Sequence, residues 1–378
     1  MIIGNSIKML PVKPSCLGRL RGGMSRNAVL KVICIGCIVT GLANVNTLFS
    51  SLSVTKDTPF ASRKSLHFQV ESDETKILQR RKTRVENQCA AANKPLLSAE
   101  NAAMSVKGEQ VEERAAEHKY PTWIVNDEGT RALYCIVPKT GSTNLRRIFA
   151  EVKSRKEKKT ELFDWSKMTP VKSWHFGFDF LMQNSKSRIA EILQRPNSIK
   201  ILSVRHPFER LISLYKMIFE GNRYENKTET FIQKVTNGVS SLIRRYLNRP
   251  YDKLNITFPM FIEYIVYHGK CVEEGNCTVS WYHAHWSPIW RMCRVCSLGY
   301  DLIMRMETFD QDLPEIFRLT NITKSTIYPE QWKRTSKGSM KKYFSQLSDK
   351  LIEDLKEMYK MDFKLFGYDY SKSDVFID

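Results

Sequence analysis

Two short segments of this chain share one pattern, in which an apolar strand leads through a turn carrying a cation and hydroxyls into an amphipathic helix. The first reads LYCIVPKTGSTN at 133–144, and the second reads ILSVRHPFERLIS at 201–213. A strand followed by such a turn directs the unpaired N–H groups of the next helix toward an anion. Two anion sites on one sheet indicate a ligand with a phosphate at each end, which is the shape of a nucleotide.

Apolar runs and helical periodicities alternate along the chain after residue 120. Strands are expected at 131–137, 197–204 and 300–306, and further helices at 258–268, 313–319 and 347–361. The helices after the two turns place apolar residues on one face, at Leu145, Ile148, Phe149 and Val152 and at Phe208, Leu211, Ile212 and Tyr215. Strands that alternate with helices predict an α/β fold, here a P-loop-like parallel sheet flanked by helices on both faces.

The N-terminal third of the chain has a different composition. Residues 28–49 are apolar apart from Lys31, Asn44 and Asn46, and their length is close to the ~20 residues of a membrane-spanning helix. Lysines and arginines without acids precede this segment, which places the N-terminus in the cytoplasm. We expect an uncleaved signal anchor, with a cleaved signal peptide as the alternative.

This anchor divides the chain into four parts. We predict a cytoplasmic tail at 1–27, the transmembrane signal anchor at 28–49, a stem at 50–119 and a single lumenal catalytic domain at 120–378. The stem is polar, charge-mixed and without apolar periodicity, so we expect it to be partly disordered, with a short helix near 102–118.

The charge of the chain favours an anionic partner. The net charge is +19, and the part from Tyr120 onward holds 41 basic and 30 acidic residues. Nucleic acid, an acidic membrane and an acidic polysaccharide all fit such a domain, and a solvated basic surface is the alternative. Four Asn-x-Ser/Thr sequons agree with a lumenal location, at Asn226, Asn255, Asn276 and Asn321.

Six cysteines follow the predicted anchor, at Cys89, Cys135, Cys271, Cys277, Cys293 and Cys296. An oxidising lumen permits disulfides among them. The last four lie close together in sequence and allow three pairings among themselves. The C-x-x-C at Cys293 and Cys296 leaves a zinc site as the alternative, although the spacing of the other pair is C-x5-C.

The first turn contains the chemistry of a phosphate loop. Gly141 allows the backbone to approach an anion closely, and Lys139 supplies a charge that can neutralise a leaving phosphate. Ser142 and Thr143 add hydroxyl donors. The turn lacks the first glycine of the pattern G-x-x-x-x-G-K-[ST], and its lysine comes early, which argues against an ordinary ATPase or kinase.

The second turn adds a guanidinium at the end of a strand. Arg205 can hold a phosphate through two parallel hydrogen bonds, whereas an ion pair with Glu209 is the structural alternative. Arg210 is either a further anion ligand or an exposed helix charge. Ser213 lies two turns into the helix and reaches an anion only if that helix runs past the ligand.

These residues also carry a resemblance to a family. PKTGSTN at 138–144 and VRHPFERLIS at 204–213 resemble the two phosphosulfate-binding motifs of the Golgi carbohydrate sulfotransferases. The likeness is to the group with the chondroitin, dermatan, HNK-1 and N-acetylgalactosamine 4-sulfotransferases. It continues through His285-Trp286-Ser287-Pro288, Cys293, Cys296, Gly299-Tyr300-Asp301, Met306-Glu307-Thr308 and the stretch 343–368. The chain departs from the family where Gly141-Ser142 replaces Ala-Cys, Leu145 replaces Trp and His206 replaces a frequent Glu.

The resemblance implies a reaction and a location. The donor would be 3′-phosphoadenosine 5′-phosphosulfate, with no metal required, and the acceptor a sugar hydroxyl of a neutral or acidic glycan. N-acetylgalactosamine of chondroitin-type chains is the expected acceptor, and no nucleic acid is involved. The enzyme would be a single-pass type II protein of the Golgi membrane. Residues 139–144 would hold the 5′-phosphosulfate, and Arg205 and Ser213 the 3′-phosphate. The complete predicted donor-binding set is Pro138, Lys139, Thr140, Gly141, Ser142, Thr143, Asn144, Arg205, Arg210 and Ser213.

Sulfuryl transfer also needs a base for the proton of the acceptor hydroxyl. Histidine suits this role because its pKa lies near ~6.5. His175, between the two motifs in the aromatic setting SWHFG, is the predicted base, and Lys139 is the second predicted catalytic residue. Glu209 and the His283/His285 pair are alternatives for the base.

Two other functions remain compatible with the sequence. A P-loop-like lumenal kinase would bind its nucleotide with Mg²⁺. A non-catalytic glycan-binding membrane protein with a degenerate site would bind glycans without any transfer.

Overall fold

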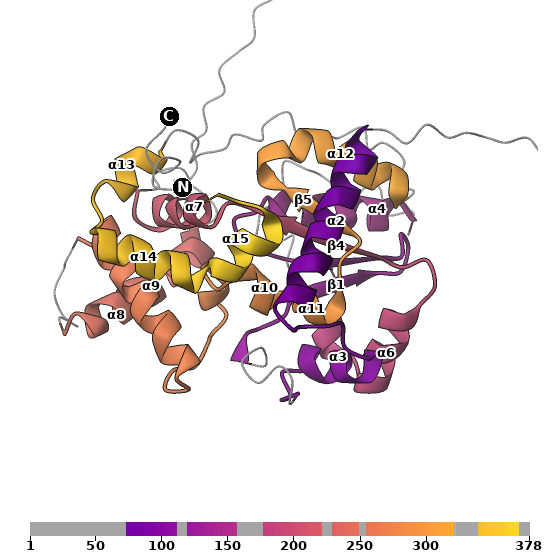
Figure 1. The fold of residues 1–378 in the computed structure, drawn as a ribbon, viewed down its shortest axis with the longest axis horizontal. Helices are drawn as coiled ribbons and strands as arrows, with labels where there is room; N and C mark the ends of the chain where they lie inside the picture. The colour runs from indigo at the N-terminus through magenta and orange to yellow at the C-terminus, as the bar shows by residue number, and fades with distance from the viewer. Residues whose placement is uncertain are drawn as a thin grey trace, which may run out of the picture. The chain divides into compact units, whose positions relative to one another are not determined.

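A five-stranded sheet with the order β3-β1-β2-β4-β5 forms the centre of this computed structural model (Figure 1). The structure describes residues 73–111, 119–156, 177–220, 229–248, 255–320, 322 and 339–369. The strands are β1 (Ile124–Asp127), β2 (Ala132–Cys135), β3 (Asp179–Phe180), β4 (Ile199–Val204) and β5 (Leu302–Arg305). The predicted strands at 131–137, 197–204 and 300–306 correspond to β2, β4 and β5.

The sheet is mixed, which corrects the prediction of a parallel sheet. β2, β4 and β5 are parallel neighbours, whereas β1 pairs antiparallel with both β2 and β3. The reversal at β1 follows from its short connection to β2, because so few residues permit only a hairpin. The turn is closed by the backbone N–H of Thr130, which donates to Oδ2 of Asp127 at 3.2 Å, and Arg131 has a φ of +57°. The parallel part holds both predicted anion loops.

The two faces of the sheet belong to two separate cores, as the alternation along a strand requires. In β2 and the residue after it, Leu133 and Cys135 enter one core, and Tyr134 and Ile136 enter the other. The first face is covered by α3 (Ala99–Val106), α6 (Lys186–Gln194), α10 (Ile289–Met292), α11 (Val295–Leu298) and α15 (Lys360–Phe366). The opposite face is covered by α4 (Ser142–Lys156) and α12 (Phe309–Leu319). The predicted coverage by helices on both faces is confirmed.

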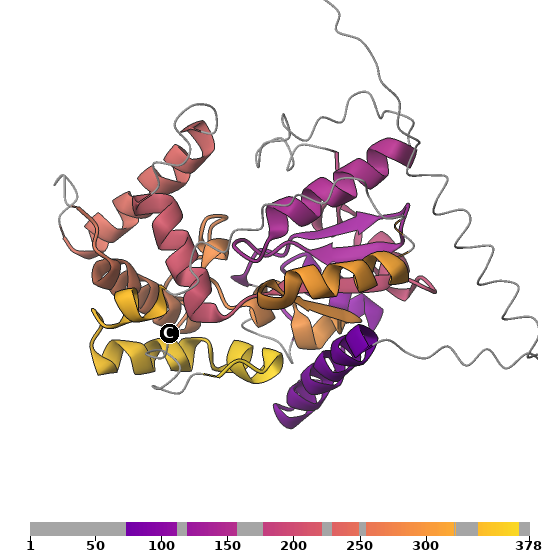
Figure 2. The ribbon, with the colours of Figure 1, turned by 90° about the horizontal axis from the view of Figure 1, so that it is seen from above.

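A third hydrophobic core lies beside the sheet, where several helices pack against one another (Figure 2). It contains apolar residues of α7 (Pro207–Phe219), α8 (Glu229–Tyr246), α9 (Phe258–Glu273), α13 (Met340–Phe344), α14 (Asp349–Met358) and α15. Stacked aromatic rings such as Phe208 and Phe344, whose centroids are 4.5 Å apart, fill it. The helix expected at 347–361 is divided into α14 and α15 at Tyr359. Since α7 directly follows β4, this core fixes one wall of the predicted site.

The folded unit extends further toward the N-terminus than the predicted boundary at residue 120. Contacts place residues 69–378 in one compact unit. Within the predicted stem, α2 (Asp73–Ala91) lies along β5, and α3 takes the place of the helix expected near 102–118. Arg81 of α2 pairs with Asp312 at 2.6 Å, and Leu78 and Val85 are buried. Periodicity missed α2 because charged residues dominate its sequence and few positions are apolar.

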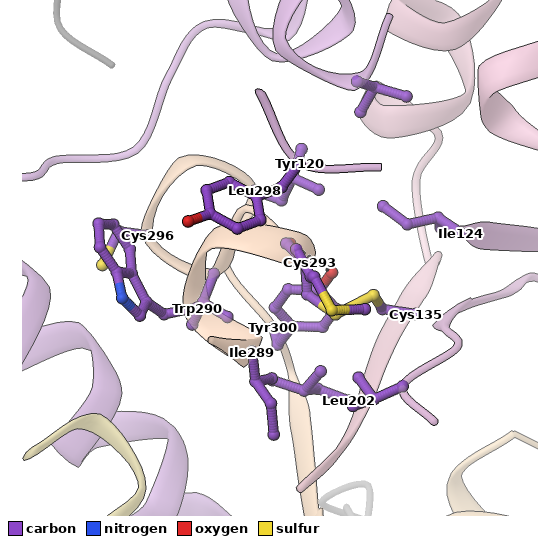
Figure 3. Close-up of a cluster of buried hydrophobic side chains, with 14 of the residues drawn as sticks. Tyr120, Ile124, Cys135, Leu202, Ile289, Trp290, Cys293, Cys296, Leu298 and Tyr300 are labelled. Carbon is purple, nitrogen blue, oxygen red and sulfur yellow. Dashed lines mark hydrogen bonds between the residues drawn. A yellow bond between two sulfur atoms is a disulfide. The ribbon is translucent and has the colours of Figure 1, made fainter. Parts of the chain in front are cut away.

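Three disulfides involve all six cysteines that follow the predicted anchor. They join Cys89 to Cys296, Cys135 to Cys293 and Cys271 to Cys277. The Cys135–Cys293 bond lies among Leu202, Ile289 and Tyr300 in the core on one face of the sheet (Figure 3). The zinc alternative is wrong, because both sulfurs of the C-x-x-C are bonded to distant cysteines. Disulfides among the six cysteines were expected without an assigned pairing, and of the last four only Cys271 and Cys277 are bonded to each other.

The predicted membrane segment at 28–49 lies outside the described residues, as do the tail and the first part of the stem. Among the helices described within 73–369, none combines the length and apolar character needed to cross a bilayer. Two of the four sequons, Asn255 and Asn276, lie in the described ranges, and both residues are exposed.

Candidate active site

The two predicted anion loops meet at one edge of the sheet. Because β2 and β4 are parallel neighbours, the loops that follow them leave the same edge, where α/β proteins bind their ligands. Nη1 of Arg205 donates to the carbonyl oxygen of Lys139 at 3.1 Å, which joins the second loop to the first. The adjacency inferred from the sequence pattern is therefore present in the fold.

The backbone of the first loop is left-handed at two positions. Lys139 has a φ of +73° and Gly141 a φ of +79°. The carbonyl of Gly141 accepts from the N–H groups of Asn144 and Leu145, at 3.0 and 3.2 Å, so α4 begins at the next residue. The first N–H groups of α4 have no partner within the helix, and its positive dipole end faces the loop. This geometry suits an anion in front of Ser142 and Thr143.

Thr140 turns its side chain away from the loop and into the protein. Its side chain is fully buried, and Oγ1 donates to the carbonyl of Val137 at 2.9 Å and bonds Oγ of Ser203 at 2.7 Å. The hydroxyl of Tyr134 bonds the same Oγ at 3.1 Å. The hydroxyl of Thr140 therefore fastens the loop to β4, which leaves only its backbone N–H for a ligand.

Lys139 lies with its ammonium against α7. Nζ is 3.4 Å from Sδ of Met217. Burial, and next the charge of Arg205, lower the pKa of Lys139 to about 7. An anion placed beside this ammonium would raise the pKa again, because an opposite charge stabilises the protonated form. The surroundings of Lys139 therefore favour a negatively charged ligand beside its ammonium.

Arg205 is buried at the end of β4 beside that ammonium. Nε and Nη2 donate to Oε2 of Glu209 at 3.3 and 3.2 Å, so the ion pair considered from the sequence is present. Ser213 lies one helical turn after Glu209 and one turn before Met217, on the same face of α7. Since Met217 reaches Lys139, α7 runs past the loop and brings Ser213 to its side.

Arg210 connects the first loop to the residues around His285. Its side chain is fully buried, and Nε donates to the carbonyl of Pro138 at 3.1 Å. Nη1 and Nη2 donate to the carbonyls of Ser287 and Ala284, each at 2.7 Å. The structure thus places this guanidinium under the loop as a clamp on three backbone carbonyls. The alternative of an exposed helix charge is therefore wrong, and direct binding of an anion by Arg210 stays a prediction.

His206 caps α7 and connects it to the end of the domain. Nδ1 accepts from the N–H of Phe208 at 3.2 Å, so Nε2 carries the proton and donates to the carbonyl of Asp369 at 3.1 Å. The backbone N–H of His206 donates to Glu307, which also accepts from Tyr368. Burial lowers the pKa of His206. The replacement of Glu by His at this position creates a helix cap.

The histidine candidates for the base fall in different places. His175 lies outside the described residues. Nδ1 of His283 accepts from the N–H of Ser280 at 2.8 Å, and its ring stacks on that of His268 at 3.9 Å. Nδ1 of His285 donates to the carbonyl of Tyr282 at 3.0 Å, and the neighbouring carbonyl of Ala284 accepts from Arg210, which also bonds Pro138 of the loop. The dipeptide His285-Trp286 was the sequence signal for this residue.

The arrangement matches a family. Residues 122–369 match the sulfotransferase family. The chain belongs to that family. The match covers both anion loops, the clamp at Arg210 and the turn with His285, so the fold described above is that of a sulfotransferase.

Individual relatives of this sulfotransferase agree. Carbohydrate sulfotransferase 11 of Rattus norvegicus is 28% identical over 308 residues, which cover 79% of this chain and 78% of the rat protein. Carbohydrate sulfotransferase 12 of Mus musculus is 24% identical over 65% of this chain and 59% of its own length. Carbohydrate sulfotransferase 8 of Mus musculus is 24% identical over 70% of this chain and 60% of its own length. No solved structure matches the chain.

Proposed function

We propose that this sulfotransferase transfers a sulfuryl group from 3′-phosphoadenosine 5′-phosphosulfate to a sugar hydroxyl of a glycan. The observation that supports the donor is the juxtaposition of two cationic loops at the carboxyl edge of parallel strands, with Arg205 bonded to the carbonyl of Lys139. The names of the relatives support a carbohydrate acceptor. We propose N-acetylgalactosamine of chondroitin-type chains as the acceptor, from the motif resemblance.

The residues at the edge of the sheet fit such a donor. The N-terminus of α4, with Gly141, Ser142, Thr143 and Asn144, provides backbone and hydroxyl donors for the 5′-phosphosulfate. Arg205 and Ser213 provide a guanidinium and a hydroxyl for the 3′-phosphate. Pro138, Thr140 and Arg210 contribute to the binding set by shaping and holding the loop.

Lys139 has the central chemical role in this proposal. Sulfuryl transfer, like phosphoryl transfer, asks the protein mainly for positioning and for stabilisation of developing charge. The ammonium of Lys139 would face the bridging oxygen, which becomes negative as the sulfur–oxygen bond breaks. A cation in a partly desolvated site stabilises that charge more than one in water.

We also propose the cellular setting that the sequence predicts. The chain would be anchored in the Golgi membrane through 28–49, with 1–27 cytoplasmic and the folded unit in the lumen. The three disulfides support a compartment that permits their formation. The exposed sequon residues Asn255 and Asn276 are accessible for glycosylation in that compartment.

The test uses the full chain in detergent-solubilised membranes, with the donor labelled in its sulfur. The acceptors are desulfated chondroitin, dermatan, keratan and heparosan, each with product analysis of the disaccharides. We expect transfer to desulfated chondroitin on the N-acetylgalactosamine residue. Transfer to another of these glycans would correct the acceptor alone. No transfer to any glycan, together with no binding of 3′-phosphoadenosine 5′-phosphate, would refute the proposed function.

A further inference from the structure

The turn that carries His285 is fastened to the phosphate loop. This turn is a short 3₁₀ helix, His283–His285. The buried guanidinium of Arg210 donates to the carbonyls of Ala284 and Ser287 and also to the carbonyl of Pro138 in the loop. The guanidinium of Arg210 therefore fixes the position of the turn relative to the loop. His285 follows the bonded carbonyl of Ala284, and Lys139 follows that of Pro138.

The tautomer of His285 is set by the backbone. Nδ1 lies 3.0 Å from the carbonyl oxygen of Tyr282, and since a carbonyl only accepts, Nδ1 carries the proton. Nε2 is then an unprotonated nitrogen with a lone pair. Among the described residues Nε2 has no hydrogen-bond partner, although His285 is only 8% exposed. The atom itself is still open to solvent. Buried polar atoms are normally hydrogen-bonded, so this acceptor is available to a donor group of a bound ligand.

Cationic side chains add to the effect of burial on His285. Burial lowers the pKa of His285 to about 3, the bond to Tyr282 opposes the shift, and Lys139, Arg210 and Arg146 add to it. The imidazole is therefore neutral at any physiological pH, with the lone pair of Nε2 available. An anionic donor beside Lys139 offsets the cations and raises this pKa, which strengthens the base when the donor is bound.

The other described candidates are held by hydrogen bonds within the protein. Both ring nitrogens of His206 are hydrogen-bonded, to Phe208 and Asp369. Nδ1 of His283 accepts from Ser280, and its Nε2 lies 3.4 Å from the hydroxyl of Tyr264. The carboxylate of Glu209 accepts two bonds from Arg205.

An exposed aromatic ring lies next to His285. The Trp281 ring is 6.5 Å from the His285 ring between centroids, and the residue is 42% exposed. An indole at the surface offers a flat apolar face with a polar tip, which suits the apolar face of a sugar ring. The turn thus combines a platform for a sugar with a base beside it.

We propose that His285 is the general base of the transfer, an inference that rests on the proposed function. Nε2 takes the proton from the acceptor hydroxyl as the oxygen forms a bond to sulfur. The bond from sulfur to the bridging oxygen breaks, and its electron pair remains on the phosphate, facing Lys139. The imidazolium then returns the proton to solvent.

The test replaces His285 in the full chain. In His285→Asn the side-chain amide can still donate to the carbonyl of Tyr282, which preserves the turn, but no base remains. We expect kcat with desulfated chondroitin to fall by about 10²–10⁴-fold, the usual size of general-base catalysis. The affinity for 3′-phosphoadenosine 5′-phosphate, measured by calorimetry, should change by less than about twofold, a negligible free-energy difference. Added imidazole should restore part of the rate of His285→Ala.

Three outcomes would overturn the inference. The first is a His285→Asn enzyme that keeps a tenth or more of its kcat. The second is a loss of rate matched by an equal loss of nucleotide affinity or melting temperature, without rescue by imidazole in His285→Ala, because that describes a structural residue. The third is a collapse of kcat in His175→Asn alone, which would assign the base to His175. Absence of transfer by the unaltered protein would instead refute the proposed function itself.

Discussion

At the scale of single residues, Lys139 carries the clearest chemical signature. Its backbone is left-handed, its ammonium contacts Met217, and its carbonyl accepts from Arg205. Among the residues that the structure describes, no carboxylate pairs with this ammonium, so the lysine loses hydration without gaining a counter-ion. An anion bound beside Lys139 would offset this loss, and residues with shifted pKa values gather at functional sites for that reason.

Replacement of Lys139 by alanine should abolish most of the transfer. Loss of one preorganised charge at the leaving oxygen corresponds to about 10²–10³-fold in kcat. The measurement is the transfer rate at saturating donor and glycan. Lys350→Ala is the matched control, since that lysine is 82% exposed in a surface pair with Asp354, and it should be unchanged. Glycan binding without transfer in the unaltered chain would favour the non-catalytic alternative.

The pKa of Lys139 predicts how donor binding depends on pH. The free protein holds Lys139 at a pKa of about 7, and a bound anion raises that value, so binding takes up a proton above pH 7. Affinity for 3′-phosphoadenosine 5′-phosphate should therefore fall as pH rises above 7, by at most about tenfold per unit. Calorimetry at several pH values measures the slope. Lys139→Arg, which stays charged, should flatten it, and an unchanged slope would contradict this account.

At the scale of elements, side-chain hydrogen bonds between elements fix the positions of the loops that form the site. The hydroxyl of Thr140 ties the first loop to Ser203 in β4, and Arg210 of α7 ties it to the turn at His285. The cap at His206 ties the start of α7 to Glu307 and Asp369. Each connection joins two elements whose relative position the chemistry requires.

Loss of the Arg210 clamp should destabilise the protein. Arg210→Met would leave three buried carbonyls without this donor, and we expect a cost of about 3–5 kcal/mol in the free energy of unfolding, since each unsatisfied buried acceptor costs about 1–3 kcal/mol. Denaturant unfolding measures it. Arg188→Met, at a surface ion pair that is 39% exposed, should cost less than about 1 kcal/mol. An equally small effect at Arg210 would show that the clamp is dispensable.

At the scale of the whole molecule, the N-terminal helices are part of the fold. α2 carries the partner of Cys296 and the partner of Asp312, and α3 packs on α6. A chain that began at residue 120 would lack α2, which packs on β5, and α3, which packs on α6. Sequence patterns that begin at 120 describe the site but not the complete folding unit.

Deletion variants test this boundary. A secreted form lacking residues 1–68 should fold, whereas one lacking 1–119 should fail to be secreted or melt at much lower temperature. The disulfide lost with Cys89 contributes about 2–5 kcal/mol, and the apolar contacts of α2 and α3 add to that. Secretion yield and thermal melting are the measurements. Equal yields and melting temperatures of the two forms would place the boundary at 120.

The sequence by itself determined the elements and the chemistry that local patterns encode. Alternation predicted β2, β4 and β5, helical spacing predicted α4 and α7, and the turns at Lys139 and Arg205 predicted neighbouring cations at one edge. Only the tertiary structure decided matters that depend on distant partners: the reversed β1, the pairing of Cys293 with Cys135, and the inclusion of α2. It also decided that Arg210 points inward as a clamp that joins the turn at His285 to the loop, because burial and hydrogen-bond partners arise only when remote segments meet.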